Sequence, residues 1–148
     1  MTLDLASMLE HPIAPLEVTI ERGRLAAFAR ATGQADPVFV DVDAARAAGY
    51  RDLPVPPTYL FSIEMEAVPP LGWLTDLDVD LRRVLHGEQR FAYRGMLYAG
   101  DRVTVRRRIA RAYEKGPGVF LVKESEFVRR DEVVAEAEGV VIVTGARP

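Results

Sequence analysis

Side chains that could transfer a proton near neutral pH are scarce in this chain. The sequence has no cysteine and two histidines, so it excludes disulfides, thiolate nucleophiles and Cys-type metal sites, and no His-rich metal site is expected. His86 is the candidate base, because it enters a strand in the run His-Gly-Glu-Gln, whereas His11 lies in the N-terminal lead-in and is given no role. A base needs a placed partner or substrate within hydrogen-bond reach, and the sequence places none beside His86. Catalysis and a structural role both stay open for His86, and the structural role is favoured.

Asp36 is the candidate acid, displaced from the usual position, and it precedes Pro37 in a turn. An Asp before a Pro also commonly bonds nearby backbone and so fixes the turn. Both interpretations stay open, and the backbone role is favoured. Asp41 is expected to cap a helix, and Asp101, after Gly100, to form the turn into a strand.

The element that must position these groups is the apolar segment from Tyr59 to Ala67. Its large apolar side chains would cover most of the circumference of a helix, which is typical of a buried central helix. A strand stays open as an alternative, because Phe61, Ile63 and Met65 alternate with polar residues at period two. We predict the helix, since Leu, Met and Glu favour helices and proline pairs flank the segment on both sides.

The remaining pattern predicts a strand, two helices and then four strands. Residues 16–21 alternate like a half-buried strand, residues 25–32 have helical spacing and end at Gly33, and a short helix follows from Ala44 to Ala48. Residues 1–15 are expected to be a lead-in and residues 71–76 a loop. The later strands are predicted at 89–94, 102–109, 119–129 and 133–144, with a tight hairpin at Arg130 and Asp131. This order predicts an α+β domain whose antiparallel sheet buries one face against the central helix.

The totals allow a single domain over residues 1–148. A hydrophobic content of 49% and a charged content of 28% are typical of soluble globular proteins, and no apolar run reaches the length of a membrane span. The N-terminus carries Asp4 and Glu10 and no basic region before an apolar core, so we expect no signal peptide and a cytoplasmic protein. A net charge of -3 gives no general attraction to nucleic acid.

Three runs together carry a resemblance to a known family. They are Ala31-Thr-Gly-Gln-Ala-Asp-Pro-Val-Phe-Val-Asp41, Leu53-Pro-Val-Pro-Pro-Thr-Tyr59, and Leu85-His-Gly-Glu-Gln-Arg-Phe91 with Ala99-Gly-Asp101. Their order and spacing resemble the MaoC-like dehydratases, and more narrowly the N-terminal, FAS1-like half-domain, over nearly the whole chain. The resemblance implies a hot-dog fold, in which an antiparallel β-sheet wraps around one long α-helix. It also implies hydratase or (R)-3-hydroxyacyl dehydratase chemistry of fatty acid metabolism, on a thioester of coenzyme A or acyl carrier protein and with no further cofactor.

The family's active motif, Gly-Asp-x-Asn-Pro-x-His, is altered here at both catalytic positions. Aligned on Gly33 and Pro37, Gln34 replaces the Asp and Phe39 replaces the His. Neither group exchanges protons near neutral pH. The resemblance therefore implies a degenerate half that shapes the substrate site of a homodimer or of a heterodimer with a catalytic MaoC-like subunit. The substrate contacts that it implies are Gln34, Phe39, Pro57, Thr58 and Tyr59.

Two other functions stay open. One is a self-sufficient hydratase or hot-dog thioesterase that uses His86 and Asp36, and the other is an acyl-CoA-binding module without turnover. The five arginines between Arg102 and Arg111 mostly alternate with Val and Thr, which favours a solvated sheet face over a nucleic-acid site. A subset of them could meet the phosphates of coenzyme A, but the pattern does not choose which.

Overall fold

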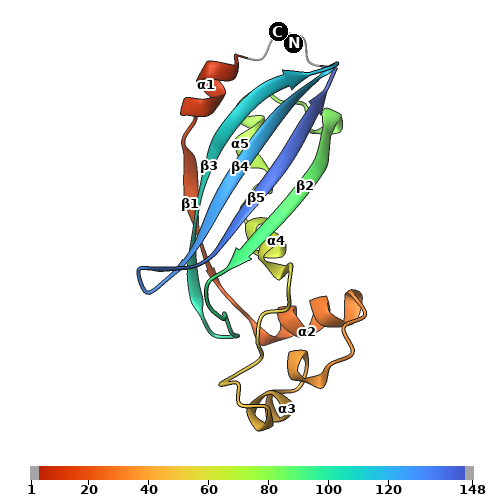
Figure 1. Ribbon diagram of the computed structural model, residues 1–148, viewed down its shortest axis with the longest axis vertical. Coiled ribbons are helices and arrows are strands. Elements are labelled where there is room, and N and C mark those ends of the chain that lie inside the picture. Colours follow the sequence, from red (N-terminus) through yellow and green to blue (C-terminus); the bar gives the residue numbers. More distant parts are fainter. Residues whose placement is uncertain (1–3, 146–148) are drawn as a thin grey trace.

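The computed structural model describes residues 4–145 and contains one antiparallel sheet of five strands in the order β1-β3-β4-β5-β2 (Figure 1). The strands are β1 Ile13–Thr19, β2 Val84–Tyr93, β3 Arg102–Lys115, β4 Gly118–Arg129 and β5 Glu132–Thr144. The predicted strands are confirmed, although β1 and β2 begin three and five residues earlier than predicted and β3 continues six residues further, to Lys115. The sheet and its covering helices confirm the α+β class and the hot-dog arrangement.

The meander of β3, β4 and β5 follows from its turn residues. Arg130 and Asp131 join β4 to β5 and both have positive φ, at 49° and 65°, as a two-residue hairpin turn with the right twist requires. Gly116, at φ 58°, precedes β4, where a residue without Cβ adopts this conformation at no steric cost. These tight turns keep the three longest strands adjacent, so β2 and β1 are left to pair at the two edges.

The central helix is present but interrupted. Helix α4, Tyr59–Glu64, confirms the helical prediction, although it ends three residues before Ala67. Residues 71–76 were predicted as a loop, and this is wrong, because α5, Gly72–Thr75, buries Trp73 and Leu74. The one long helix that the resemblance implied is thus divided into two short helices. Pro69 and Pro70 stand between them and lack the N–H groups that a continuous helix would need.

The other helices lie before the sheet strands β2 to β5. Residues 1–15 were predicted to be only a lead-in, but Asp4 caps a short helix α1, Leu5–Glu10, by accepting a hydrogen bond from the N–H of Ala6. Helix α2, Arg22–Ala31, ends as expected before Gly33, and Asp41 caps α3, Val42–Ala47, as predicted. Two 3-10 turns complete the set, η1 Pro37–Phe39 and η2 Leu81–Arg83. Helices α2 and α3 form a separate layer beyond the end of β2 (Figure 1).

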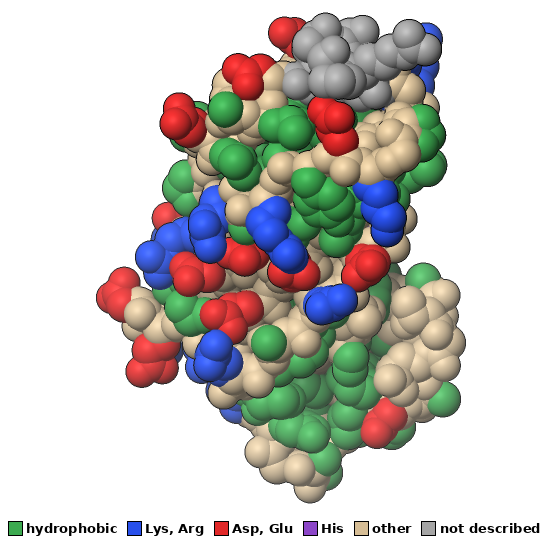
Figure 2. All heavy atoms as spheres, turned by 45° about the horizontal axis from the view of Figure 1, so that its top comes forward, with side chains coloured by type: hydrophobic (Ala, Val, Ile, Leu, Met, Phe, Trp, Pro, Cys, Tyr) green, Lys and Arg blue, Asp and Glu red, His purple; other side chains and the backbone are tan. Residues whose placement is uncertain are grey.

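One sheet face is apolar and the other is charged. The inward side chains of β3 and β4, including Val103, Val105, Leu121 and Phe127, are fully buried and pack with Leu60 and Ile63 of α4 or with Leu74 of α5. The sheet side of the molecule shows a band in which basic and acidic side chains alternate (Figure 2). Among residues 4–145, no helix is long and apolar enough to cross a membrane.

Candidate functional site

An apolar pocket of about 200 Å³ lies where the N-terminus of α4 meets the end of β2. Its walls come from η1, the segment before α4, the first turn of α4 and the loop after β2. The lining residues are Phe39, Tyr50, Pro54, Val55, Pro57, Leu60, Tyr93, Gly95, Met96, Leu97 and Ala135. The pocket therefore joins segments that are far apart in the sequence.

A short backbone clasp holds these segments together. The N–H of Val55 donates to the carbonyl of Leu97 at 2.9 Å, and the N–H of Ala99 donates to the carbonyl of Leu53 at 2.9 Å. The N–H of Thr58 donates to the hydroxyl oxygen of Tyr93 at 3.0 Å. An unpaired backbone N–H or carbonyl group costs free energy where water is excluded. These hydrogen bonds therefore hold the segment before α4 against the loop that follows β2.

The pocket lining has little capacity for proton transfer. Tyr50 and Tyr93 supply the only side-chain hydroxyl groups among the lining residues. The lining has no carboxylate, imidazole, amine or guanidinium. An apolar concave site with a few polar groups at its edge suits the binding of an apolar group. Among the residues that line this pocket, none is a carboxylate, imidazole or amine that could act as a general base.

Two predicted contact residues, Phe39 and Pro57, line the pocket directly. Thr58 lies at its edge through the hydrogen bond to Tyr93. Tyr59 instead points into the core, where it is 4% exposed and meets Phe28 edge-on with ring centres 5.1 Å apart. Burial raises the pKa of Tyr59 above its ordinary value, which leaves its hydroxyl protonated.

Gln34 does not line the pocket, and its side-chain oxygen accepts from the N–H of Asp36 at 3.3 Å. The carboxylate of Asp36 accepts from the N–H of Val38 at 3.1 Å and so caps η1. This is the backbone role that the Asp-Pro turn favoured. The two polar side chains thus hold the turn that carries Phe39 into the pocket.

His86 lies on β2, in a different element from Asp36. Its Nε2 atom is 3.1 Å from the side-chain oxygen of Gln89, and its ring stacks on Phe61 with centres 5.0 Å apart and planes 15° apart. The carboxylate of Asp36 instead accepts the hydrogen bond that caps η1. Among the described residues, no hydrogen bond or ion pair joins Asp36 to His86. The structure does not bring these two candidates together as an acid and base pair.

Sequence reasoning missed most of the wall formed by the loop after β2. Tyr93, Met96 and Leu97 come from a strand end and a loop whose local pattern shows only alternation and a turn. Their approach to Pro54 and Val55 depends on the clasp. The signal available in the sequence was the Leu53 to Tyr59 run, whose prolines keep the wall extended.

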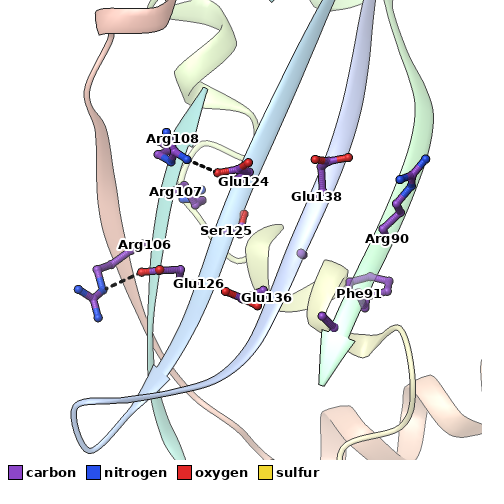
Figure 3. A pocket seen from close by; sticks show the side chains of 12 residues that line it. Arg90, Phe91, Arg106, Arg107, Arg108, Glu124, Ser125, Glu126, Glu136 and Glu138 are labelled. Carbon is purple, nitrogen blue, oxygen red and sulfur yellow. Dashed lines mark hydrogen bonds and ion pairs between the residues drawn. The ribbon is translucent and has the colours of Figure 1, made fainter. Parts of the chain in front are cut away.

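A larger hollow, of about 730 Å³, lies on the outer sheet face, and most of the charged side chains that line it are paired with one of opposite sign (Figure 3). Arg106 lies 3.6 Å from a Glu126 oxygen and Arg108 lies 2.5 Å from a Glu124 oxygen. Of the other arginines in the run from Arg102 to Arg111, Arg102 pairs with Glu17 and Arg111 with Glu138. This agrees with the predicted solvated face, because these four arginines each face a carboxylate. Arg107, which also lines the hollow, forms no ion pair among the described residues and donates instead to the carbonyl of Ala14.

A buried polar cluster anchors α4 to the sheet. Glu64 is 1% exposed, and its carboxylate accepts from Lys123 at 2.5 Å and from the hydroxyl of Ser125. Burial lowers the pKa of Lys123, and the Glu64 charge limits that fall. Arg107, on the same inner face, donates to the carbonyl of Ala14 at 2.9 Å, and burial lowers its pKa as well. Because Glu64 and Ser125 are enclosed, the cluster has a structural role.

Comparisons with known proteins agree with this fold. The family model described as "FAS1-like, dehydratase domain region" matches residues 7–137. A UPF0336 protein of Parafrankia sp. is 38% identical over 134 residues, which cover 87% of this chain and 86% of that protein. A UPF0336 protein of Streptomyces coelicolor is 44% identical over 94 residues, so the match spans 64% of this chain and 61% of the relative.

A solved structure shares the arrangement of strands and helices. It is a chain of the C-terminally truncated HadBC complex, a 3R-hydroxyacyl-ACP dehydratase from Mycobacterium tuberculosis. The TM-score is 0.76 at 25% identity, with 87% of this chain and 91% of that chain covered. The hot-dog arrangement seen here is therefore similar to that of the HadBC chain.

Proposed function

The chain belongs to the FAS1-like dehydratase domain family, and from this membership we propose that it is the acyl-binding subunit of a hydratase or (R)-3-hydroxyacyl dehydratase. Its substrate would be an acyl chain carried as a thioester on coenzyme A or acyl carrier protein, with no cofactor besides that carrier. A partner subunit would supply the acid and the base. The reaction would belong to fatty acid metabolism.

The observation that carries this proposal is the side chain of Phe39 in the pocket wall. The resemblance puts a catalytic His at this position, and here a phenyl ring lines an apolar pocket whose lining holds no carboxylate or imidazole. Removing a water molecule from a 3-hydroxyacyl thioester needs a general base for the α-proton and an acid for the leaving hydroxyl, both in contact with the substrate. The pocket suits the apolar part of the substrate, and the proton transfers must come from groups outside it.

The free edge of β2 supports a partner subunit. In the sheet order β1-β3-β4-β5-β2, strand β2 pairs only with β5 among the described residues. Beside it, Phe61 of α4 is only half-buried and covers His86. An unpaired strand next to a partly exposed apolar helix face is a surface that a second subunit covers. The similar HadBC chain comes from a complex, which agrees with a heterodimer, and a second copy of this chain would cover the same surface.

The experiment is to follow the loss of enoyl absorbance with a short enoyl-CoA. The chain is assayed alone and after co-expression with a MaoC-like subunit that carries an intact Gly-Asp-x-Asn-Pro-x-His motif. Since a missing general base costs on the order of 100-fold to 10,000-fold, the pair should be at least about 100-fold faster than the lone chain. Changing the motif His of the co-expressed subunit to Ala should abolish the gain.

Two variants of this chain complete the design. Phe39→His with Gln34→Asp should restore only part of the activity to the lone chain, because the surrounding residues must hold a catalytic pair to within about half an ångström. His86→Ala should leave the activity of the pair unchanged. A lone chain as fast as the pair, with turnover abolished in His86→Ala, would show instead that the chain is self-sufficient and that His86 is its base.

A further inference from the structure

A basic hollow adjoins the apolar pocket on its outer side. It has a volume of about 370 Å³ and is lined by Arg51, Met96, Tyr98, Arg129 and Arg130. Met96, which is 46% exposed, lines both the hollow and the apolar pocket. The two spaces therefore form one apolar-to-basic surface.

A second contact links the same two spaces. Tyr50 lines the apolar pocket and its ring centre lies 6.2 Å from the ring centre of Tyr98, which lines the basic hollow. Tyr98 also belongs to the clasp, because it forms the bridge with Pro54. A ligand that occupies the apolar pocket and leaves it past Met96 would thus meet the basic hollow.

Two of the arginines are held in place. The guanidinium of Arg51 lies over the Tyr98 ring at 4.4 Å from its centre and pairs with Asp101. Arg129 donates to the carbonyl of Met96 at 2.8 Å and to Asp101 at 3.1 Å. Both guanidinium groups still have donors left, because each carries five N–H groups. They are preorganised, which lowers the entropy cost of binding an anion.

The hollow carries excess positive charge. Within residues 4–145, Asp101 is the only acidic side chain paired with these arginines, so one negative charge stands against the three positive charges of Arg51, Arg129 and Arg130. Asp101 is 6% exposed and lies behind the arginines. Arg130 is exposed at the hairpin tip and forms no ion pair within the described chain. This contrasts with the outer sheet face, where each exposed arginine from Arg102 to Arg111 faces a glutamate.

We propose that the hollow lined by Arg51, Arg129 and Arg130 binds the phosphate groups of the carrier to which the acyl chain is attached. The inference rests on the proposed function, because it takes the apolar pocket to hold the acyl chain. Arginine suits the purpose, since its planar fork matches two phosphate oxygens at once. Coenzyme A and the phosphopantetheine of acyl carrier protein share this chemistry, and either would meet the same arginines.

The test compares three probes with the same acyl-pantetheine part, of which one has no phosphate, one has the 4'-phosphate and one has the complete phosphorylated nucleotide of coenzyme A. They are hexanoyl-pantetheine, hexanoyl-4'-phosphopantetheine and hexanoyl-CoA, and their Kd values are measured by calorimetry on the full chain. The phosphorylated probes should bind more tightly than hexanoyl-pantetheine, and the gain should shrink as salt is raised. A full gain with phosphopantetheine assigns the site to the phosphate shared by both carriers, whereas a gain only with hexanoyl-CoA that shrinks with salt and is reduced in Arg130→Asn assigns it to the nucleotide phosphates. Both outcomes support a phosphate site.

The first variant is Arg130→Asn, because Asn tolerates the positive φ of this position while removing the charge. It should weaken the phosphorylated probes by roughly threefold to tenfold, as expected for one partly exposed charge-assisted contact. It should leave hexanoyl-pantetheine unchanged. Arg82→Ala is the matched control, since it removes one exposed arginine at the opposite end of β2. Arg51→Lys is the second variant, which keeps the charge near Asp101 but loses the fork.

Two results overturn the inference. One is an equal Kd for the three probes with the wild type, and the other is an equal effect of Arg130→Asn and Arg82→Ala. If hexanoyl-pantetheine still binds in either case, the apolar pocket and the proposed function stand while the phosphate site falls. If no acyl probe binds and no partner subunit confers turnover, the proposed function itself fails.

Discussion

Glu64→Gln tests how the buried ion pair holds α4 against the sheet. At 2.5 Å, two unit charges attract by about 7 kcal/mol if the effective dielectric constant is about 20. The variant cannot lose that much, because Lys123, left alone, can release its proton. Releasing a proton at pH 7 from an amine with an ordinary pKa of about 10.4 costs about 4.6 kcal/mol. We therefore expect a loss of about 3 to 5 kcal/mol in the free energy of unfolding at pH 7, as for other broken buried pairs.

The stability of the Glu64→Gln variant should rise with pH. Burial lowers the pKa of Lys123, and without Glu64 it should fall further. Between that lowered pKa and about 10.4, the unfolded chain binds one proton more than the folded chain, so stability rises with pH. Relative to the wild type, the variant should recover by up to about 1.4 kcal/mol for each pH unit between pH 7 and 9.

Urea unfolding at pH 7 and pH 9 measures both quantities. Glu124→Gln is the control, since it breaks an exposed pair with Arg108 on the opposite face of β4 and should cost at most about 1 kcal/mol. The double variant Glu64→Leu with Lys123→Met should lie close to the wild type, because it leaves neither charge unpaired. A loss below about 1 kcal/mol for Glu64→Gln, or a loss that grows as the pH rises, would refute the reasoning.

Three further predictions follow from burial and pairing. Ile63→Ala should cost about 2 to 5 kcal/mol in urea unfolding, because Ile63 is fully buried, whereas Phe61→Ala should cost less in the lone chain, since Phe61 is only half-buried. Phe61→Lys should shift the micromolar dimer that we expect towards monomer in sedimentation velocity, and an unchanged dimer would place the subunit contact elsewhere. Burial alone would raise the pKa of Asp101, but its hydrogen bonds from two arginines and the Tyr98 N–H hold that pKa below its ordinary value. The stability advantage of the wild type over Asp101→Asn should therefore be complete above about pH 4 and should shrink as the pH falls further, as measured by thermal unfolding from pH 6 to pH 2.

The sheet could be predicted because its strands have two different faces. In β4 the buried Leu121 and Phe127 alternate with the outward Glu124 and Glu126, and the flanking turns have residues suited to positive φ. Helix α5 could not be predicted, because its four residues are fewer than two turns and show no helical period. It exists because Trp73 and Leu74 fill the core beside α4, which is a tertiary effect.

The polar interior was hidden for a related reason. Lys123 and Ser125 occupy inward positions of β4, where alternation places them between Leu121 and Phe127. In the sequence, a polar residue at an inward position only breaks the alternation of apolar and polar residues and indicates no partner. The partner, Glu64 of α4, is brought to Lys123 and Ser125 by the fold. The basic hollow could not be predicted either, since Arg51 comes from the segment after α3, whereas Arg129 and Arg130 come from the end of β4 and the turn that follows it.

Phe39 connects the altered motif with the apolar character of the pocket, because its phenyl ring stands at the position of the motif His and lines the pocket wall. An imidazole in this wall would need a hydrogen-bond partner, because an unpaired buried polar group costs free energy. Gln34 and Asp36 could have faced such a ring, but here they bond the backbone of the same turn. A phenyl ring in the wall needs no hydrogen-bond partner from the turn. The pocket can therefore contact the apolar surface of a ligand along its whole lining. In the proposed function, the phenyl ring that stands at the position of the motif His would also favour the binding of an apolar acyl chain, and this would give a physical reason for dividing binding and chemistry between two subunits.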